Sequence, residues 1–151
     1  MIKVTFVCLG NICRSPMAEL IFTDMVKRNG LSDKISITSC ATCGSESGSH
    51  MYSYARRTLQ SHGIEGDHIA RKIDRADLES DYILVMDESN YRDVTALKGA
   101  PKERIFKLCH FTDRPRDVAD PWYTRDFETA YRDIEDGCKS LLAHLKEKHS
   151  L

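Results

Sequence analysis

The chain has 151 residues, of which 30% are charged and 41% hydrophobic, and its formal net charge is −1. These values predict one soluble globular domain spanning residues 1–151. The near-neutral charge gives no electrostatic basis for nucleic-acid binding, and no apolar run is long enough for a membrane span. Since the N-terminus also lacks a secretory pattern, we expect a cytoplasmic protein whose cysteines are reduced.

Strand-like and helix-like segments alternate along the chain. Short runs of β-branched and aromatic residues predict strands, and longer runs with apolar residues at helical spacing predict helices. This alternation predicts an α/β fold in which a parallel sheet lies between helices. The expected strands are Ile2–Val7, Ile35–Cys40, Tyr82–Met86 and Ile105–Cys109, and the expected helices are Met17–Lys27, Tyr52–Ser61, Asn90–Leu97 and Phe127–Lys146.

The loop between the first strand and the first helix, residues 8–14 with the sequence CLGNICR, carries the strongest chemical signal. Such a loop points backbone N–H groups inward, and the following helix, for which Ser15 is the expected cap, adds partial positive charge. This field favours a thiolate at Cys8, while Arg14 offers a planar fork for two phosphate oxygens. We interpret the loop as a cysteine nucleophile in a phosphate-binding loop. The alternative is a buried cysteine beside a surface arginine.

Two positions inside this loop suit an unusual backbone. Gly10 tolerates a positive φ, and Asn11 tolerates it better than most residues. We expect the loop to use this tolerance to close around a phosphate.

A cysteine that attacks phosphorus also requires a general acid, because the leaving oxygen needs a proton. The best candidate is Asp120, which lies between the fourth expected strand and the last helix. Trp122 and Tyr123, directly after it, are suited to walling a cleft and stacking on a substrate ring. Asp113 and Asp117 precede Asp120 in the same segment and remain alternatives.

The remaining cysteines give weaker signals. Cys40 and Cys43 form a Cys-x-x-Cys pair, but no second ligand pair at a suitable spacing favours a metal site. Cys109 ends an expected strand and Cys138 lies on the apolar stripe of the last helix, so we expect both in the core.

The order and spacing of these motifs resemble the low-molecular-weight protein tyrosine phosphatases along the whole chain. The segments that carry the resemblance are Val7–Pro16, Ser39, Ala41-Thr42, His62–Ile64, His68–Arg71, Asp81–Asn90 and Asp120–Tyr123.

The resemblance implies a three-layer α-β-α fold around a four-stranded parallel sheet. It implies an enzyme that hydrolyses phosphotyrosine monoesters through a phosphocysteine on Cys8, without metal or cofactor. In this scheme Arg14 binds the phosphate and the transition state, and Asp120 acts as general acid and then general base. The Ser15 hydroxyl stabilises the thiolate, and Cys13 matches a second loop cysteine that traps an oxidised nucleophile as a disulfide.

The resemblance further implies two sets of residues around the phosphate. The phosphate- or substrate-contacting set is Leu9, Gly10, Asn11, Ile12, Cys13, Ser15, Trp122 and Tyr123. The supporting set is Ser39, His68 and Asp87, with Asn11 sharing the hydrogen-bonded support of the loop. Expected partners are phosphotyrosine proteins and a tyrosine kinase, but no nucleic acid, for a monomer or weak dimer.

Rival functions are a thiol-dependent arsenate reductase of the same fold and a phosphoprotein-binding module without turnover. The segment from Ile73 to Asn90 has no cysteine for a disulfide relay, which disfavours the reductase. Related protein-arginine phosphatases resemble this chain but have threonine at the position of Ile12. Ser45, where the family offers a rim aromatic, and the stretch Ser49–Tyr52 depart from the family pattern, which leaves substrate preference open.

Overall fold

A four-stranded sheet, wholly parallel, forms the centre of the computed structural model, which describes residues 1–151. The strand order is β2-β1-β3-β4, so β1 is a central strand paired in register with β2 and β3. The predicted α/β fold is therefore confirmed. The strands are β1 Ile2–Cys8, β2 Ile35–Ala41, β3 Tyr82–Val85 and β4 Ile105–Lys107.

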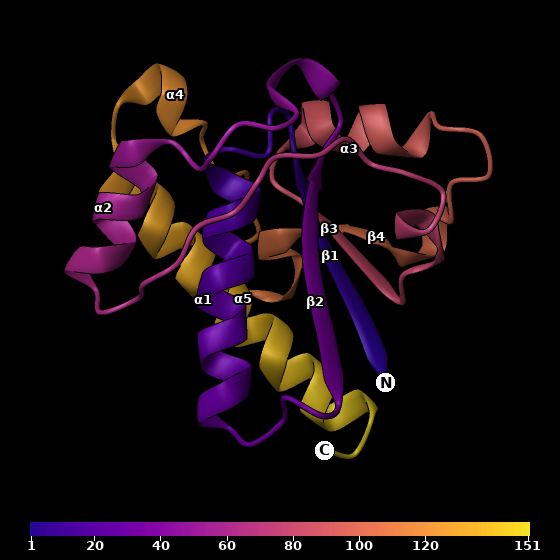
Figure 1. The fold of residues 1–151 in the computed structure, drawn as a ribbon. Coiled ribbons are helices and arrows are strands. Elements are labelled where there is room, and N and C mark those ends of the chain that lie inside the picture. The colour runs from indigo at the N-terminus through magenta and orange to yellow at the C-terminus, as the bar shows by residue number, and fades with distance from the viewer.

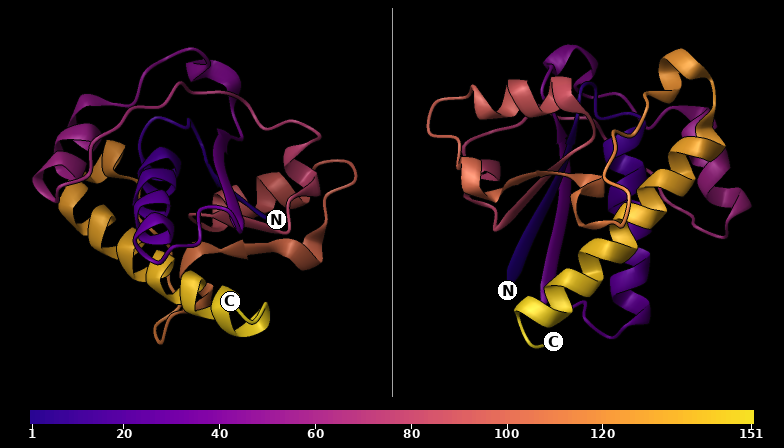
Figure 2. Two further views of the ribbon diagram at one scale, coloured as in Figure 1. Left: turned by 60° about the horizontal axis from the view of Figure 1, so that its bottom comes forward. Right: turned by 180° about the vertical axis from the view of Figure 1, so that it is seen from behind.

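Helices cover both faces of this sheet (Figures 1 and 2). On one face, α1 lies beside the long α5, with α2 outside them, and α3 lies on the other face. None of the helices is both long and apolar enough for a bilayer span. The α-helices are α1 Arg14–Arg28, α2 Ser53–Ser61, α3 Glu88–Thr95, α4 Pro121–Thr124 and α5 Phe127–Lys148, and the 3-10 helices are η1 Gly44–Glu46, η2 Asp77–Glu79, η3 Lys102–Arg104 and η4 Leu108–Phe111.

The alternation of side chains along β1 separates two parts of the core. Val4 and Phe6 point to the α1 and α5 face and join the larger cluster of 29 buried residues. Val7 points to the α3 face, where it joins a smaller cluster of six that includes Val94 of α3. Both faces of a parallel sheet are thus buried, as its crossover helices require.

Most predicted element ends shift by one to three residues, and three features differ in kind from the sequence predictions. The fourth strand ends at Lys107, and the chain enters η4 at Leu108, because its next residues pack under α5 instead of continuing the sheet. The helix α4 was expected as loop. The cap expected at Ser15 is wrong, since α1 begins at Arg14 and the hydroxyl of Ser15 contacts Cys8 and Asn11 instead of capping the helix.

The carboxyl ends of the parallel strands meet at one edge of the sheet. There the chain leaves β1 at Cys8, leaves β2 at Ala41 and reaches Asp87 just after β3. Ligands of open α/β sheets bind at this edge. The fold therefore brings the loop after β1 together with the segments that follow β2 and β3.

Candidate active site

The loop from Cys8 to Arg14 wraps around the Cys8 sulfur. The backbone N–H groups of Asn11 and Ser15 donate to this sulfur over 3.3 and 3.4 Å, and the Ser15 hydroxyl lies 3.0 Å from it. The N-terminus of α1 also points here and contributes positive potential. These donors favour a negatively charged sulfur at the base of the loop.

Asn11 holds the middle of the loop in a left-handed conformation, with a φ of 59°. Its amide group donates to Ser15 and to Ser39 over 2.8 and 3.0 Å. Its side-chain oxygen lies 2.7 Å from His68 Nε2 and accepts from the backbone N–H of Arg71 over 3.1 Å. Three chain segments thus fix this one side chain. Of the two loop residues that tolerate a positive φ, Asn11 adopts it and Gly10 does not.

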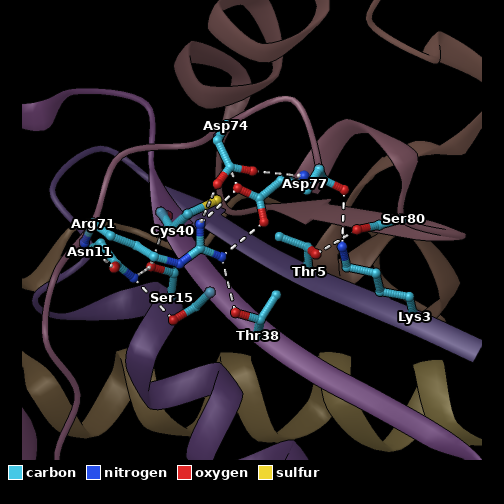
Figure 3. Close-up of polar contacts among 12 residues, drawn as sticks. Lys3, Thr5, Asn11, Ser15, Thr38, Cys40, Arg71, Asp74, Asp77 and Ser80 are labelled. Atoms are coloured by element: carbon cyan, nitrogen blue, oxygen red, sulfur yellow. Dashed lines mark hydrogen bonds and ion pairs between the residues drawn. The ribbon is translucent and has the colours of Figure 1, made fainter.

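Arg71 is a supporting residue that the sequence reasoning did not single out. Its guanidinium donates to both carboxylate oxygens of Asp77 over 2.8 Å each and to Thr38 of β2 over 3.0 Å (Figure 3). The hydrogen bonds to Asp77 raise the pKa of Arg71. Burial opposes ionisation of Asp77, but the bonds from Arg71 outweigh it and lower the pKa of this carboxyl. The backbone that supports Asn11 is therefore fixed by a charged pair.

Arg14 is buried at the floor of the site, with 2% of its surface exposed. One guanidinium nitrogen donates to Asp87 over 2.7 Å and to the carbonyl of Val118 over 2.8 Å. Burial lowers the pKa of Arg14, but the nearby Cys8 and Asp87 outweigh burial and raise it. Asp87 also caps α3 by accepting from the N–H of Asn90 over 2.8 Å, so it orients Arg14 from a fixed position.

Asp120 is the carboxyl group that reaches this site. Its Oδ2 lies 3.4 Å from the second terminal nitrogen of Arg14, and its Oδ1 accepts from the N–H of Trp122 as the cap of α4. The two alternatives lie elsewhere, because Asp113 is exposed outside the pocket and Asp117 pairs with Lys107 over 3.0 Å.

A pocket of about 220 Å³ opens over Cys8. The loop and the α4 segment form most of its wall, and Ser15, Ser39, His68 and Asp87 are not among its lining residues. Its lining residues are Cys8, Leu9, Gly10, Asn11, Ile12, Cys13, Arg14, Cys43, Ser45, Glu46, Asp120, Trp122 and Tyr123.

Two wall residues, Cys43 and Glu46, were not singled out for the pocket. They come from the turn after β2, where Ser45 occupies the position of the family's rim aromatic and also lines the pocket. Cys43 is exposed, and its contact with Ser45 lowers the pKa of its thiol. The pairing of β2 with β1 brings this turn beside the loop.

Cys13 and Cys40 are buried thiols close to Cys8. Burial and the neighbouring Cys8 raise the pKa of Cys13 to about 12. Burial also raises the pKa of Cys40, with a contribution from Asp77. Both side chains are therefore protonated at neutral pH.

Comparison with known proteins gives a consistent result over the whole chain. The family described as low molecular weight phosphotyrosine protein phosphatase matches residues 3–151. Low molecular weight protein-tyrosine-phosphatase YfkJ of Bacillus subtilis is 38% identical over 156 aligned positions, which cover 100% of both chains.

Solved structures agree with this match. The crystal structure of YfkJ aligns with a TM-score of 0.93 at 38% identity, covering 98% of this chain and 96% of that one. A protein tyrosine phosphatase from Entamoeba histolytica aligns with a TM-score of 0.92 at 33% identity and 99% coverage of both chains. The drosophila arginine phosphatase DARP aligns with a TM-score of 0.87 at 30% identity, covering 96% of this chain and 98% of that one.

Proposed function

Since this chain belongs to the low molecular weight phosphotyrosine protein phosphatase family, and is a protein-tyrosine-phosphatase by that membership, we propose how its residues perform the reaction. Cys8 is the nucleophile, Arg14 binds the phosphate, and Asp120 is the general acid and base. The observation that carries this proposal is that all three line one pocket, with the sulfur ringed by hydrogen-bond donors.

In the first step, the Cys8 thiolate attacks phosphorus, and the bond from phosphorus to the phenolic oxygen breaks. Asp120 gives its proton to that oxygen, so that a neutral phenol leaves. The guanidinium of Arg14, which is held by Asp87 and the carbonyl of Val118, and the loop N–H groups stabilise the charge on the phosphoryl oxygens.

In the second step, Asp120, now a carboxylate, takes a proton from water as the water oxygen attacks the phosphocysteine. The bond from sulfur to phosphorus breaks, and Cys8 departs as a thiolate. The N–H groups of Asn11 and Ser15 and the Ser15 hydroxyl support this departure, because each lies within 3.4 Å of the sulfur. Inorganic phosphate then leaves the pocket.

The pocket walls favour an aromatic leaving group. Leu9, Ile12, Trp122 and Tyr123 supply apolar and aromatic surface around the entrance, and a phenyl ring gains from burial against such surface. We propose phosphotyrosine proteins, made by a tyrosine kinase, as the substrates.

We also propose that the chain works as one domain over residues 1–151, as a monomer or weak dimer in the cytoplasm. Its six cysteines are all unpaired, which suits a reducing compartment. Cys13 has a redox role in this proposal: peroxide oxidises the Cys8 thiolate to a sulfenic acid, and the Cys13 sulfur displaces water from it to form a disulfide.

Turnover of phosphotyrosine, phosphoserine and phosphoarginine peptides by three variants tests the proposed chemistry. We expect wild type to prefer phosphotyrosine, and Cys8→Ser to abolish turnover while still binding inorganic phosphate. Asp120→Asn should lower kcat by roughly 10²- to 10⁴-fold, the usual contribution of a general acid. The matched control Asp117→Asn should keep wild-type kcat, since Asp117 lies outside the pocket.

Full activity of Cys8→Ser would overturn the nucleophile assignment. A large loss in Asp117→Asn with none in Asp120→Asn would move the general acid to Asp117. A preference for phosphoarginine would keep the nucleophile and change the substrate.

A further inference from the structure

Arg125 has a backbone conformation that is rare for a long side chain. It ends α4 in the left-handed region, with φ 61° and ψ 14°. Its N–H donates to the carbonyl of Pro121 over 2.9 Å and so closes the single turn of this helix. A non-glycine residue persists in this conformation only where its surroundings hold it there.

The side chain of Arg125 is held by an aromatic cage. The guanidinium donates to the hydroxyl of Tyr52 over 2.8 Å. The guanidinium carbon also lies between 5.3 and 5.9 Å from the ring centres of Tyr52, Tyr54, Trp122 and Phe127. Contacts of this length between a cation and aromatic rings are attractive.

The cage ties α4 to the phosphate-binding loop. Tyr52, which precedes α2, donates its backbone N–H to the carbonyl of Ile12 over 2.9 Å. Its ring centre also lies 4.9 Å from that of Trp122. One residue thus joins the loop around Cys8 to the segment that carries Asp120.

Asp120 needs such an anchor because its own segment is weakly held. A helix of four residues is not stable alone, and of its members only Pro121 is buried. Trp122 is 45% and Tyr123 75% exposed. The contact from Asp120 to Arg14 is long, at 3.4 Å, so it does not fix the carboxyl by itself.

We propose that Arg125 is a positioning residue that, through Tyr52, holds Asp120 over the phosphate-binding loop. The inference rests on the proposed role of Asp120 as general acid. Arg125 does not touch the reacting atoms. It acts by limiting how far the α4 segment moves from the position at which Asp120 reaches the leaving oxygen.

The test compares kcat/KM, which reports the first step and not the shared hydrolysis of the phosphocysteine, for aryl phosphates whose leaving phenols range from strongly acidic to weakly acidic. A misplaced acid slows poor leaving groups most, because good ones depart without a proton. Arg125→Gly keeps the left-handed backbone and removes the guanidinium. We expect it to lower kcat/KM roughly tenfold for phenyl phosphate and less than about threefold for dinitrophenyl phosphate, as small misplacements of catalytic groups do.

Two tyrosine variants separate the anchor from general packing. Tyr52→Phe keeps the ring but removes the hydroxyl that accepts from Arg125, so it should show a weaker form of the same leaving-group dependence. Tyr54→Phe is the matched control, because its hydroxyl makes no bond to Arg125, and it should behave as wild type. Inhibition by inorganic phosphate should be unchanged in all three variants, since the loop remains intact.

Asp120→Asn in the same substrate series separates failure of the general-acid role of Asp120 from failure of the positioning role of Arg125. If it shows no added leaving-group dependence, Asp120 is not the acid and the proposed function fails. If Asp120→Asn does show it, and Arg125→Gly resembles wild type or loses kcat/KM equally for every substrate, the positioning role is overturned. Should Arg125→Gly fail to fold, Tyr52→Phe decides the question: wild-type behaviour there overturns the inference.

Discussion

Asn11 shows how much of the site depends on one buried amide. The residue is fully buried, and both the nitrogen and the oxygen of its side-chain amide are hydrogen-bonded to other segments. Asparagine is among the few residues that adopt a left-handed backbone readily, and alone among the loop residues it also supplies an amide for this network. Conformation and hydrogen bonding therefore demand the same residue type.

Substitution of Asn11 by glycine and by alanine separates these two contributions. Asn11→Gly keeps the left-handed backbone and loses the hydrogen bonds, which leaves buried partners unsatisfied and costs about 1–3 kcal/mol. Asn11→Ala loses the same bonds and adds about 1 kcal/mol or more of backbone strain. We expect urea unfolding to rank the stabilities wild type, glycine variant, alanine variant. Equal stability of the two variants would show that the φ of 59° carries no strain.

The predictability of the site follows from how its residues are distributed along the chain. The residues from Cys8 to Ser15 are contiguous, so one motif reveals their chemistry. Arg125 lies in no motif, and Arg71 lies in the segment His68–Arg71 but was given no role there, because the contacts of both residues exist only after distant segments pack. Arg71 meets Asn11 because the chain at Ala41 pairs with the segment around residue 72, a contact that the sequence does not encode locally.

At the scale of elements, α5 packs closely against the short η4. A methyl group placed on Gly137 of α5 would lie 2.6 Å from the Cγ atom and 3.2 Å from the carbonyl oxygen of Leu108. This close approach explains why a glycine, a poor helix former, occupies the middle of a 22-residue helix.

Gly137→Ala should therefore destabilise the protein, although alanine favours helix over glycine. The clash costs about 1–3 kcal/mol, which exceeds the roughly 1 kcal/mol gained in helix propensity. Lys139→Ala, at an exposed position on the same helix, is the control and should change stability by less than about 0.5 kcal/mol. Thermal unfolding measures both, and a stabilised Gly137→Ala would mean that Leu108 moves aside freely.

The same contact explains why the fourth strand was predicted too long. Leu108 and Cys109 are apolar and follow Ile105 and Phe106, so the run looks like one strand in sequence. In the structure they turn under α5 as η4. The four strands and four longer helices were predictable because each has its own hydrophobic period. The single turn of α4 is too short to have one.

At the scale of the whole molecule, the pair of Arg71 and Asp77 connects three separate parts of the chain. It joins the segment that runs beside the end of β2, the β2 residue Thr38 and, through the Arg71 backbone, the phosphate-binding loop. Asp77 also accepts from the N–H of Asp74 over 2.9 Å, so its carboxylate has several donors. An ionised Asp77 therefore stabilises the assembled fold and not one element of it.

The contribution of this pair to the free energy of unfolding should decrease as the pH falls. Because the folded protein lowers the pKa of Asp77, its contribution is complete above the ordinary carboxyl pKa of about 4 and is lost as the pH falls through the lower folded value. Asp77→Asn should cost about 2–4 kcal/mol at pH 7, below the full cost of breaking a buried pair because the side chain of Arg71 is 36% exposed.

Urea unfolding of wild type and Asp77→Asn, repeated from pH 7 down to about pH 2, measures this dependence. The difference between the two proteins should shrink below about pH 4, because protonation removes from wild type the charge that the variant already lacks. Asp24→Asn, which breaks the exposed contact to Arg28, is the control and should show little difference at any pH. A deficit for Asp77→Asn that stays constant down to pH 2 would mean that the shape of the side chain, and not its charge, holds the three segments together.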